Sequence, residues 1–367
     1  MTNRLHYQIA LTLVPQVGAI TAKTLVSYCG SAEAVFRSSR KDLLKIPGIG
    51  PGVVQAIAAS AALRLAEAEL AFLEQYGVTA LFYTDEHFPA RLRQNADCPA
   101  LLYFKGSDAG LLSARRMVAV VGTRQPTEYG KAVCEELVDG LRAYDVVLVS
   151  GLAFGIDITA HRKATQLGVP NIAVLGHGLG KVYPAQHRSA ALSLLENGGL
   201  LTEYTHNTGP DREHFPMRNR IIAGLCDALL VVETASSGGS MISAELAAQY
   251  ERDVFAVPGR LRDPKSAGCN LLIKNNRAKL IETAADLAAN LGWDEAGRQR
   301  NVQTKLFLDL NPAETQLIDI IRRRPEIPID ELTRAANQSP GALAALLLGL
   351  EFKGMVRTLP GKRYILT

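Results

Sequence analysis

The chain has 367 residues, 47% apolar and 21% charged, which is the composition of an ordinary soluble globular protein. Its length allows two or three domains. No apolar run reaches the length of a membrane span, and the first residues lack the pattern of a secretory signal, so we expect no membrane association. Five cysteines without a close pair argue against a disulfide framework and a structural zinc site. We therefore expect a protein of the reducing cytoplasm.

The formal net charge of +4 is unevenly distributed along the chain. Residues 1–65 hold seven Lys or Arg against two acidic residues, and residues 311–367 hold eight against six. The middle of the chain, residues 66–310, is slightly acidic as a result. A polyanion-binding role for the middle must therefore rest on a few well-placed cations, with backbone amides adding to them.

The first 65 residues contain a short repeat between helical patterns. VPQVG at Val14–Gly18 recurs as IPGIG at Ile46–Gly50, and apolar helix-like stretches flank each copy. This arrangement resembles a tandem helix–hairpin–helix (SAM-like) unit, whose glycine hairpins offer amides to nucleic-acid phosphates. Gln16 stands where the first hairpin would have glycine. A small helical bundle with two tight turns is the alternative, and the local positive charge slightly favours DNA contact.

Residues 66–292 alternate apolar strand-like runs with segments of helix length. A helix at 66–76 and strands at 78–83 and 101–104 come first, and we expect them to extend a central sheet. Six more strands are predicted, at 118–121, 146–149, 171–175, 199–204, 228–233 and 253–257. Such alternation is typical of a parallel sheet covered on both faces. The predicted fold class is α/β, with an extended Rossmann-like sheet at its core.

The last part of the chain has a different character. Residues 293–311 are polar and predict a linker. Three helical patterns and a hairpin that turns at Pro360-Gly361 then predict a winged-helix domain over 312–367. Its third helix is rich in Ala and Leu and nearly lacks the side chains that read base edges. We expect this domain to contact a protein or to have a regulatory role, rather than to recognise a DNA sequence.

Two glycine turns are the most informative local feature of the middle region. The strands of MVAVVGTR (Met117–Arg124) and VVLVSGLAFGID (Val146–Asp157) each end in small residues and lead into a helical pattern. Amides at a helix start favour anions, and glycine lets an anion approach the backbone closely. Because parallel strands end at one edge of a sheet, we expect the two turns to form one phosphate-binding surface.

These turns do not predict a dinucleotide site. The first turn lacks the GxGxxG spacing, and Ser150-Gly151 stand where an acidic residue would bind a ribose, so no cofactor is expected. Asp157 and His161 lie four apart on a predicted helix, as an acid–base or metal pair would. No third ligand or nucleophile accompanies them. We therefore predict no metal and no catalytic residue, and expect Asp157 to start a helix with His161 packed below it.

Further motifs follow in the order VLGHGL, YP, FPMRNRIIAGL, VVE, SGGS, VPG and GCNLLI. Together with VGTR and SGLAFGIDITAH, they resemble the DNA-processing protein A (DprA/Smf) family over about residues 80–280. The resemblance implies a non-enzymatic mediator of recombination that binds single-stranded DNA. Such proteins protect incoming strands during natural transformation and load RecA recombinase onto them. The resemblance also implies a homodimer joined through GCNLLIKN as a strand, with Leu271, Leu272 and Ile273 as contacts or, alternatively, as core.

The predicted DNA-binding residues are small, polar or basic, and most follow from the motifs. They are Gly122, Thr123, Arg124, Ser150, Gly151, Gly155, Lys181, Arg188, Arg218, Asn219, Arg220 and Lys274. Arg218 and Arg220 do not share a helix face, so one is expected to reach DNA while the other braces the fold. His187 stands where many members of the family have Asn. Phe154 and Phe215 are expected to pack in the core, with base stacking as the alternative.

A nucleotide-hydrolysing enzyme on the same fold is the alternative function. SSGGSMISAE at residues 236–245 is similar to the PGGxGTxxE loop of nucleotide phosphoribohydrolases, in which the Glu pairs with an Arg. Glu245 and Arg218 would be that pair here. Ser240-Met241 break the spacing of the loop, and the flanking DNA-type modules would have no use in such an enzyme. Both features favour the DNA-binding function.

Overall fold

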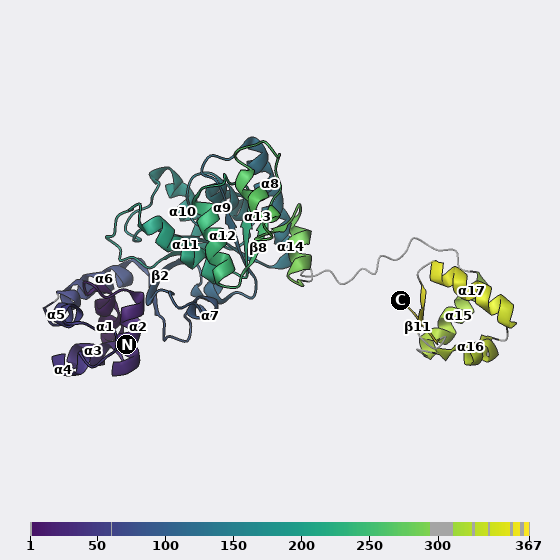
Figure 1. The fold of residues 1–367 in the computed structure, drawn as a ribbon, viewed down its shortest axis with the longest axis horizontal. Coiled ribbons are helices and arrows are strands. Elements are labelled where there is room, and N and C mark those ends of the chain that lie inside the picture. The colour runs from purple at the N-terminus through teal and green to yellow at the C-terminus, as the bar shows by residue number, and fades with distance from the viewer. Residues whose placement is uncertain are drawn as a thin grey trace. The chain divides into compact units, whose positions relative to one another are not determined.

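The computed structural model describes residues 2–59, 61–293, 311–324, 327–336, 338–352, 355–359 and 363–366. The chain forms two compact units, residues 1–297 and 298–367 (Figure 1). Most of the predicted linker and the Pro360-Gly361 turn lie outside the described residues. None of the helices in the described part of the chain combines the length and apolarity of a membrane span.

Six helices precede the sheet in the first unit. They are α1 (Thr2–Leu13), α2 (Ala19–Cys29), α3 (Ala32–Arg37), α4 (Arg40–Leu43), α5 (Pro51–Ala59) and α6 (Ala62–Tyr76). The two predicted hairpins connect α1 to α2 and α4 to α5. Gln16 adopts the left-handed backbone at φ 66°, the conformation that Gly48 takes at φ 81° in the second copy. The glycine missing from the first hairpin is therefore replaced by a residue held in the same unusual conformation.

The N-terminal helices and the sheet share one apolar core. Ala62, Ala66 and Leu73 of α6 are buried together with Ile9 of α1 and with Tyr103 of the sheet. Figure 1 shows this helical group beside β2 (Leu101–Gly106). The boundary predicted at residues 65/66 falls inside α6 and remains a prediction.

The central sheet has nine strands in the order β1-β2-β6-β5-β4-β3-β7-β8-β9. The remaining strands are β1 (Thr79–Phe82), β3 (Met117–Val121), β4 (Val147–Ser150), β5 (Asn171–Val174), β6 (Gly198–Thr202), β7 (Ala228–Val231), β8 (Asp253–Ala256) and β9 (Lys279–Leu280). All eight strands predicted for the central sheet are present. The pairings from β6 to β9 are parallel, as predicted, whereas β1–β2 and β2–β6 are antiparallel. A two-residue strand such as β9 is too short to leave a periodic signal.

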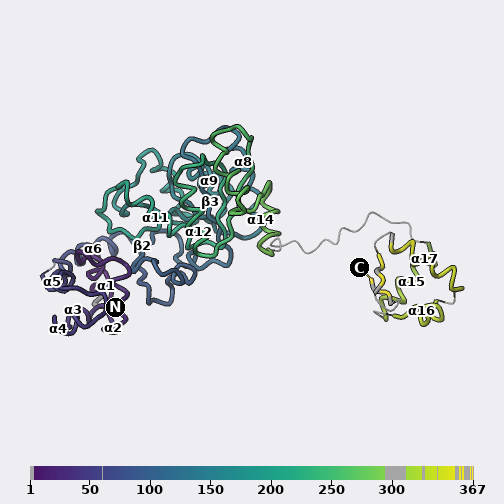
Figure 2. The backbone as a smooth tube through the Cα atoms, in the orientation of Figure 1, coloured from purple at the N-terminus to yellow at the C-terminus, as the bar shows by residue number. Residues whose placement is uncertain are grey.

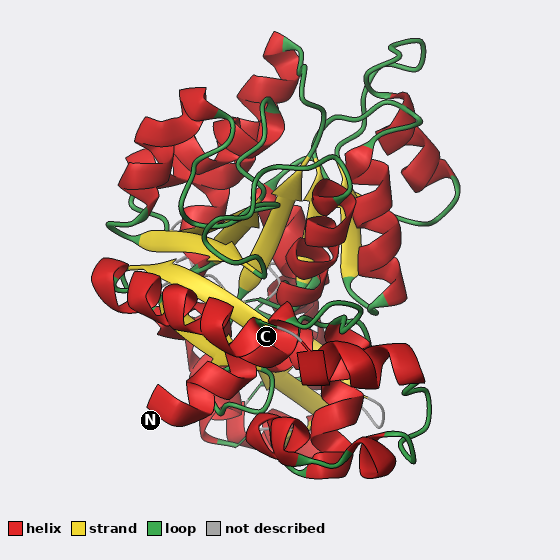
Figure 3. Ribbon diagram, turned by 90° about the vertical axis from the view of Figure 1, so that its left-hand side faces the viewer, coloured by secondary structure: helices red, strands yellow, loops and turns green. Residues whose placement is uncertain are grey.

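Helices cover both faces of the sheet (Figure 3). The covering helices are α7 (Ala90–Arg93), α8 (Glu128–Leu141), α9 (Ile156–Gln166), α10 (Arg188–Leu194), α11 (His214–Leu225), α12 (Gly239–Gln249), α13 (Ala267–Lys274) and α14 (Ala284–Asn290). β3 runs between α9 and α12 (Figure 2). Its Val118 and Val120 are buried with residues of α8 and α9, whereas Met117, Ala119 and Val121 are buried with residues of α11 and α12.

The second unit is a winged helix. Its elements are α15 (Pro312–Arg323), β10 (Ile327–Pro328), α16 (Ile329–Ala336), α17 (Pro340–Phe352), β11 (Val356–Leu359) and β12 (Arg363–Leu366). β11 and β12 form the predicted antiparallel hairpin, and β10 pairs with the other side of β12. Leu317, Leu332 and Leu347 bring the three helices together in one small core.

One predicted strand is wrong. GCNLLIKN lies in α13, a helix, and does not join the sheet. Leu272 is buried against the sheet and Ile273 is partly buried there, while Leu271 is 39% exposed. Apolar runs this short do not distinguish a buried helix from a strand, and here the helical period decides which side chain is buried.

Candidate nucleic-acid interface

The two glycine turns lie side by side, as predicted. β3 and β4 are parallel neighbours, so Gly122 and Gly151 leave the sheet at the same edge. A cavity of about 750 Å³ opens at this edge, between the first turn, α11 and the loop that leads into α12. Predicted residues in its lining are Gly122, Thr123, Arg124, Arg218 and Asn219.

Arg218 is the unusual residue of this cavity. Its side chain is buried, with the whole residue only 4% exposed, yet its Nε and Nη1 donate to no group of the described chain. Asp157 is the nearby opposite charge. Burial raises the pKa of the Asp157 carboxyl, and Arg218 opposes that shift. A buried guanidinium with two unmatched donors retains hydrogen-bonding capacity for an anion that enters the cavity.

Two more arginines line the cavity and are exposed. Arg124 follows the first turn, and its guanidinium carbon lies 5.4 Å from the ring centroid of Phe215. Arg212 precedes α11. Phe215 is half-buried rather than a core residue, and its ring also lies 6.0 Å from that of Tyr183. The cavity therefore combines three cations with an accessible aromatic surface.

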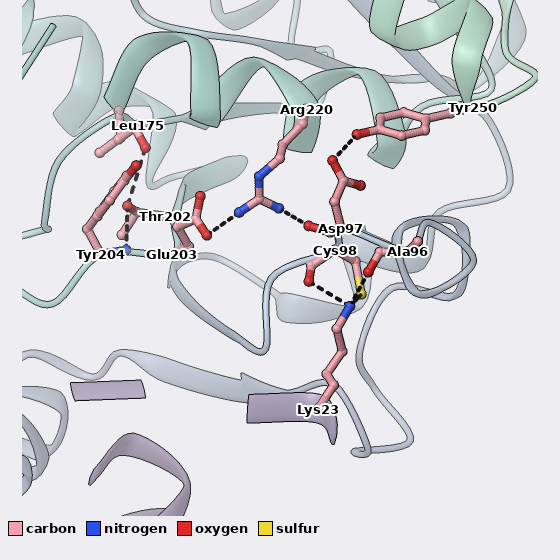
Figure 4. A network of polar contacts seen from close by, with 10 residues as sticks. All are labelled: Lys23, Ala96, Asp97, Cys98, Leu175, Thr202, Glu203, Tyr204, Arg220 and Tyr250. Atoms are coloured by element: carbon pink, nitrogen blue, oxygen red, sulfur yellow. Dashed lines mark hydrogen bonds and ion pairs between the residues drawn. The ribbon is translucent and has the colours of Figure 1, made fainter. Parts of the chain in front are cut away.

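Arg220 has a different role from Arg218. Its Nη1 donates to the main-chain oxygen of Asp97 at 2.5 Å, and its Nη2 pairs with the Glu203 carboxylate. Tyr250 and Lys23 hold the same loop, through the Asp97 carboxylate and the carbonyls of Ala96 and Cys98 (Figure 4). These contacts hold Arg220 within the fold, and the DNA contact predicted for it remains a prediction.

Four backbone amides of the turns are used within the protein. Thr123 N donates to the Glu233 carbonyl at 2.7 Å, and Ile156 N donates to the Thr123 carbonyl at 3.2 Å. The Asp157 carboxylate accepts from Ala153 N and from Gly151 N. An internal carboxylate and two carbonyls therefore occupy these four amides, and the contact of the turns with a phosphate remains a prediction.

The glycines of the turns make room for other parts of the protein. A Cβ on Gly151 would lie 1.4 Å from Nη1 of Arg218, so this glycine provides the space in which the guanidinium lies. Gly155 has φ 82°, and a Cβ there would meet the Thr123 carbonyl at 2.1 Å. Ser150 is fully buried and donates to the Val120 carbonyl. These three residues support the cavity from behind and are not part of its lining.

The remaining predicted cations lie elsewhere. Lys181 and Arg188 are exposed beside a separate cavity of about 500 Å³, which Lys105 also lines. Lys274 is exposed at the end of α13. His187 is buried, and its Nδ1 lies 2.8 Å from the Leu152 carbonyl, so it supports the second turn from below.

The suspected catalytic pairs do not form. Asp157 is directed to the amides of the second turn, whereas His161 Nδ1 lies 2.8 Å from Asn171 Oδ1. Burial lowers the pKa of His161 to about 4, so its ring is neutral. Glu245 is exposed and pairs with Arg277 at 3.2 Å rather than with Arg218. Across the described ranges, no group of three or more His, Cys, Asp or Glu could hold a metal ion.

Sequence reasoning missed two features of this region. Arg212 was not a candidate, because it lies in a polar stretch with no motif and reaches the cavity only through the path of the loop. Phe154 was expected in the core but is 44% exposed. Its position in a turn, directly before Gly155, was the signal available, since turns run over the protein surface.

Three family models match the chain in the order of its domains. They are SAM-like helix-hairpin-helix tandem at 9–63, DNA recombination-mediator protein A at 79–292, and DprA winged helix domain at 308–362. Protein Smf of Escherichia coli is 33% identical over 80% of this chain and 79% of its own. The DNA processing protein DprA of Bacillus subtilis is 38% identical over 64% of this chain and 76% of its own.

Solved structures agree with these matches. DNA processing protein A of Streptococcus pneumoniae has a TM-score of 0.68 at 32% identity, over 79% of this chain and 99% of its own. That of Helicobacter pylori, solved to explain a single-stranded DNA binding mode, has a TM-score of 0.54 at 31% identity, over 60% of this chain and 98% of its own. On its three domains, its sheet order and these relatives, the chain belongs to the DNA-processing protein A (DprA/Smf) family of DNA recombination mediators.

Proposed function

We propose that this protein binds single-stranded DNA without sequence preference, protects incoming strands during natural transformation and loads RecA recombinase onto them. The observation that carries the DNA-binding part is Arg218, a buried guanidinium with two donors unmatched in the described chain, at the wall of a cavity that Arg124 and Arg212 also line. The relative from Helicobacter pylori was solved for its binding of single-stranded DNA and supports the same ligand. All five cysteines are free thiols, which is in keeping with a protein that functions in the reducing cytoplasm.

The charges of the cavity favour a phosphate backbone over base recognition. Guanidinium groups bind phosphates as charge-assisted pairs, and the half-buried ring of Phe215, over which Arg124 lies, is an aromatic surface for an unpaired base of any identity. Thr123 and Asn219 are the predicted uncharged polar residues of the lining, and Nδ2 of Asn219 lies 3.4 Å from the Gly239 carbonyl. We further propose that the protein acts as a homodimer and breaks no bond in its ligand. Leu271, exposed on α13, is the remaining candidate contact of the predicted interface.

The test is the binding of fluorescent oligothymidine, measured by anisotropy at several salt concentrations. Arg124→Ala is expected to weaken binding and to reduce the slope of log K against log salt by about 0.7, the loss of one single-strand phosphate contact. Arg142→Ala, which removes an exposed arginine beyond the far end of α8, is the matched control and should bind like the parent. An unchanged slope for Arg124→Ala would contradict the assignment of the cavity.

Nucleotide hydrolysis is tested by incubation with adenosine monophosphate. The exposed pairing of Glu245 with Arg277 leaves Arg218 without the partner that such an enzyme needs. We therefore expect no release of free base. Release of adenine would favour the enzyme over the DNA-binding function.

A further inference from the structure

A second cavity adjoins the first at Arg124, which lines both. It measures about 460 Å³ and lies between the first turn, the start of α8 and the exposed side of α9. Its lining is Arg124, Gln125, Pro126, Lys131, Glu135, Phe154, Gly155, Ile158, Thr159 and Arg162. Arg124, Phe154 and Gly155 come from the two glycine turns, whereas no motif of the sequence indicated Lys131 or Arg162.

The charge of the second cavity is positive. Arg124, Lys131 and Arg162 face a single carboxylate, that of Glu135. Lys131 also pairs with Glu128 at 2.7 Å, on the surface of α8. Arg162 is exposed on α9 and makes no hydrogen bond or ion pair with any residue that the structure describes. Two of these cations, Arg124 and Arg162, are thus available to an external anion.

An aromatic ring completes the second cavity. Phe154 is 44% exposed, although an aromatic side chain of this size is normally buried. The ring of His187 lies edge-on to it, with 4.8 Å between centroids, and His187 is itself fixed by the Leu152 carbonyl. Phe154 is therefore held in a fixed position while part of its ring stays accessible, which suits a platform for an unpaired base.

We propose that this second cavity is a further nucleotide-binding subsite, in which Phe154 stacks on an unpaired base and Arg162 binds a phosphate. Arg124 is shared by the two cavities, so a strand held in the first continues past Arg124 into the second. The subsite rests on the proposed function, because a strand must occupy the first cavity before it can extend into the second. Its ligand is a single strand of either nucleic acid, since stacking and phosphate contacts require only an unpaired base.

The experiment compares the full-length protein with Phe154→Ala and Arg162→Ala on oligothymidines of about 4 to 20 nucleotides. Both variants are expected to bind the shortest oligomers like the parent. On longer oligomers, Phe154→Ala should lose about 5- to 150-fold in affinity, the range for one stacked base. Arg162→Ala should reduce the slope of log K against log salt by about 0.7, and only for the long oligomers. Phe154→Trp should retain the affinity, and Arg142→Ala is the charge-matched control.

The outcomes separate the subsite from the proposed function. If the parent binds and Arg124→Ala weakens it, but Phe154→Ala and Arg162→Ala match the parent at every length, the subsite is wrong and the function stands. If the parent binds no oligothymidine, both are wrong. Thermal unfolding of each variant shows whether a loss of affinity comes from a loss of fold, and equal losses at all lengths would also contradict the subsite.

Discussion

At the scale of single residues, the neighbours of Arg218 provide both the space and the opposite charge that its guanidinium needs. Gly151 leaves open the space that the guanidinium occupies, and Asp157 lies close enough to oppose its charge. The two unmatched donors carry a cost that an anionic ligand would remove. The glycine is therefore needed for the arginine rather than for direct contact with a phosphate.

Gly151→Ala tests this relation. The new methyl group would overlap Nη1 of Arg218, so we expect the guanidinium to move and oligothymidine binding to fall about tenfold or more, as for a lost charge-assisted contact. Gly341→Ala, in the winged helix, is the matched control, because nothing lies within 4 Å of a Cβ at Gly341. Anisotropy measures binding, and circular dichroism checks the fold. Full affinity in a folded Gly151→Ala would disprove the relation.

His161 makes the stability depend on pH. Burial lowers its pKa to about 4 from the usual 6.5, so the unfolded chain takes up a proton at a higher pH than the folded chain. Its contribution is present above pH 6.5 and is lost as the pH falls from 6.5 to 4, by about 3 kcal/mol in all. Denaturant unfolding of the parent and of His161→Gln between pH 7 and 4 measures this. The parent should lose more stability than the variant, and parallel curves would refute it.

At the scale of elements, α6 holds a loop of the interface. His206 N and His206 Nδ1 both lie within hydrogen-bond distance of the buried Glu69 carboxylate, at 3.0 and 2.6 Å. The ring of His206 also stacks on Phe72, with 4.4 Å between centroids. The same loop leads to Arg212, which lines the first cavity. The N-terminal helices therefore help to position the cavity, in addition to any contact that they make with DNA.

Glu69→Ala is expected to lower the free energy of unfolding by about 1–3 kcal/mol, because it leaves the donors of His206 unmatched at a partly buried site. It should also weaken oligothymidine binding moderately, through Arg212. Glu67→Ala, an exposed change on the same helix, is the control and should have almost no effect. Denaturant titration reports the stability. A stable Glu69→Ala that binds normally would show that α6 does not position this loop.

At the scale of the whole molecule, the interface is one edge of a parallel sheet, where strands, turns and helix starts meet. The first cavity is lined by both polar and apolar residues, with Arg218 buried at its wall. A duplex keeps its bases stacked inside and presents only its outer phosphates, so it would reach Arg124 and Arg212 but not the aromatic surface. A single strand exposes both its phosphates and its bases.

We therefore expect oligothymidine to compete with a duplex of equal length and to bind the protein more tightly, by about tenfold or more. Competition gel shifts measure the ratio of the two affinities. They are run at one salt concentration, because the strength of phosphate contacts depends on salt for both ligands. Poly(dA), a second single strand of different sequence, controls for base preference. Equal affinity for duplex and single strand would indicate that the cavities do not accept bases.

The order of the elements and the meeting of the two glycine turns followed from sequence alone. The spacing of apolar residues and the identity of turn residues specify strands and helices locally. Parallel strands must then end at a common edge of the sheet. Arg124 could be placed at that edge for the same reason. The direction of the two outer strands β1 and β2 did not follow, because a loop without a crossover helix permits either direction.

What the sequence could not decide was which groups are already satisfied. Arg218 and Arg220 look alike in the chain, yet Arg220 is bound to Asp97 and Glu203 while Arg218 faces a cavity. The amides of the second turn looked free, but Asp157 of the following helix accepts from two of them, those of Gly151 and Ala153. Hydrogen-bond partners come from segments far apart in sequence, so only the tertiary structure settles which donors remain for a ligand.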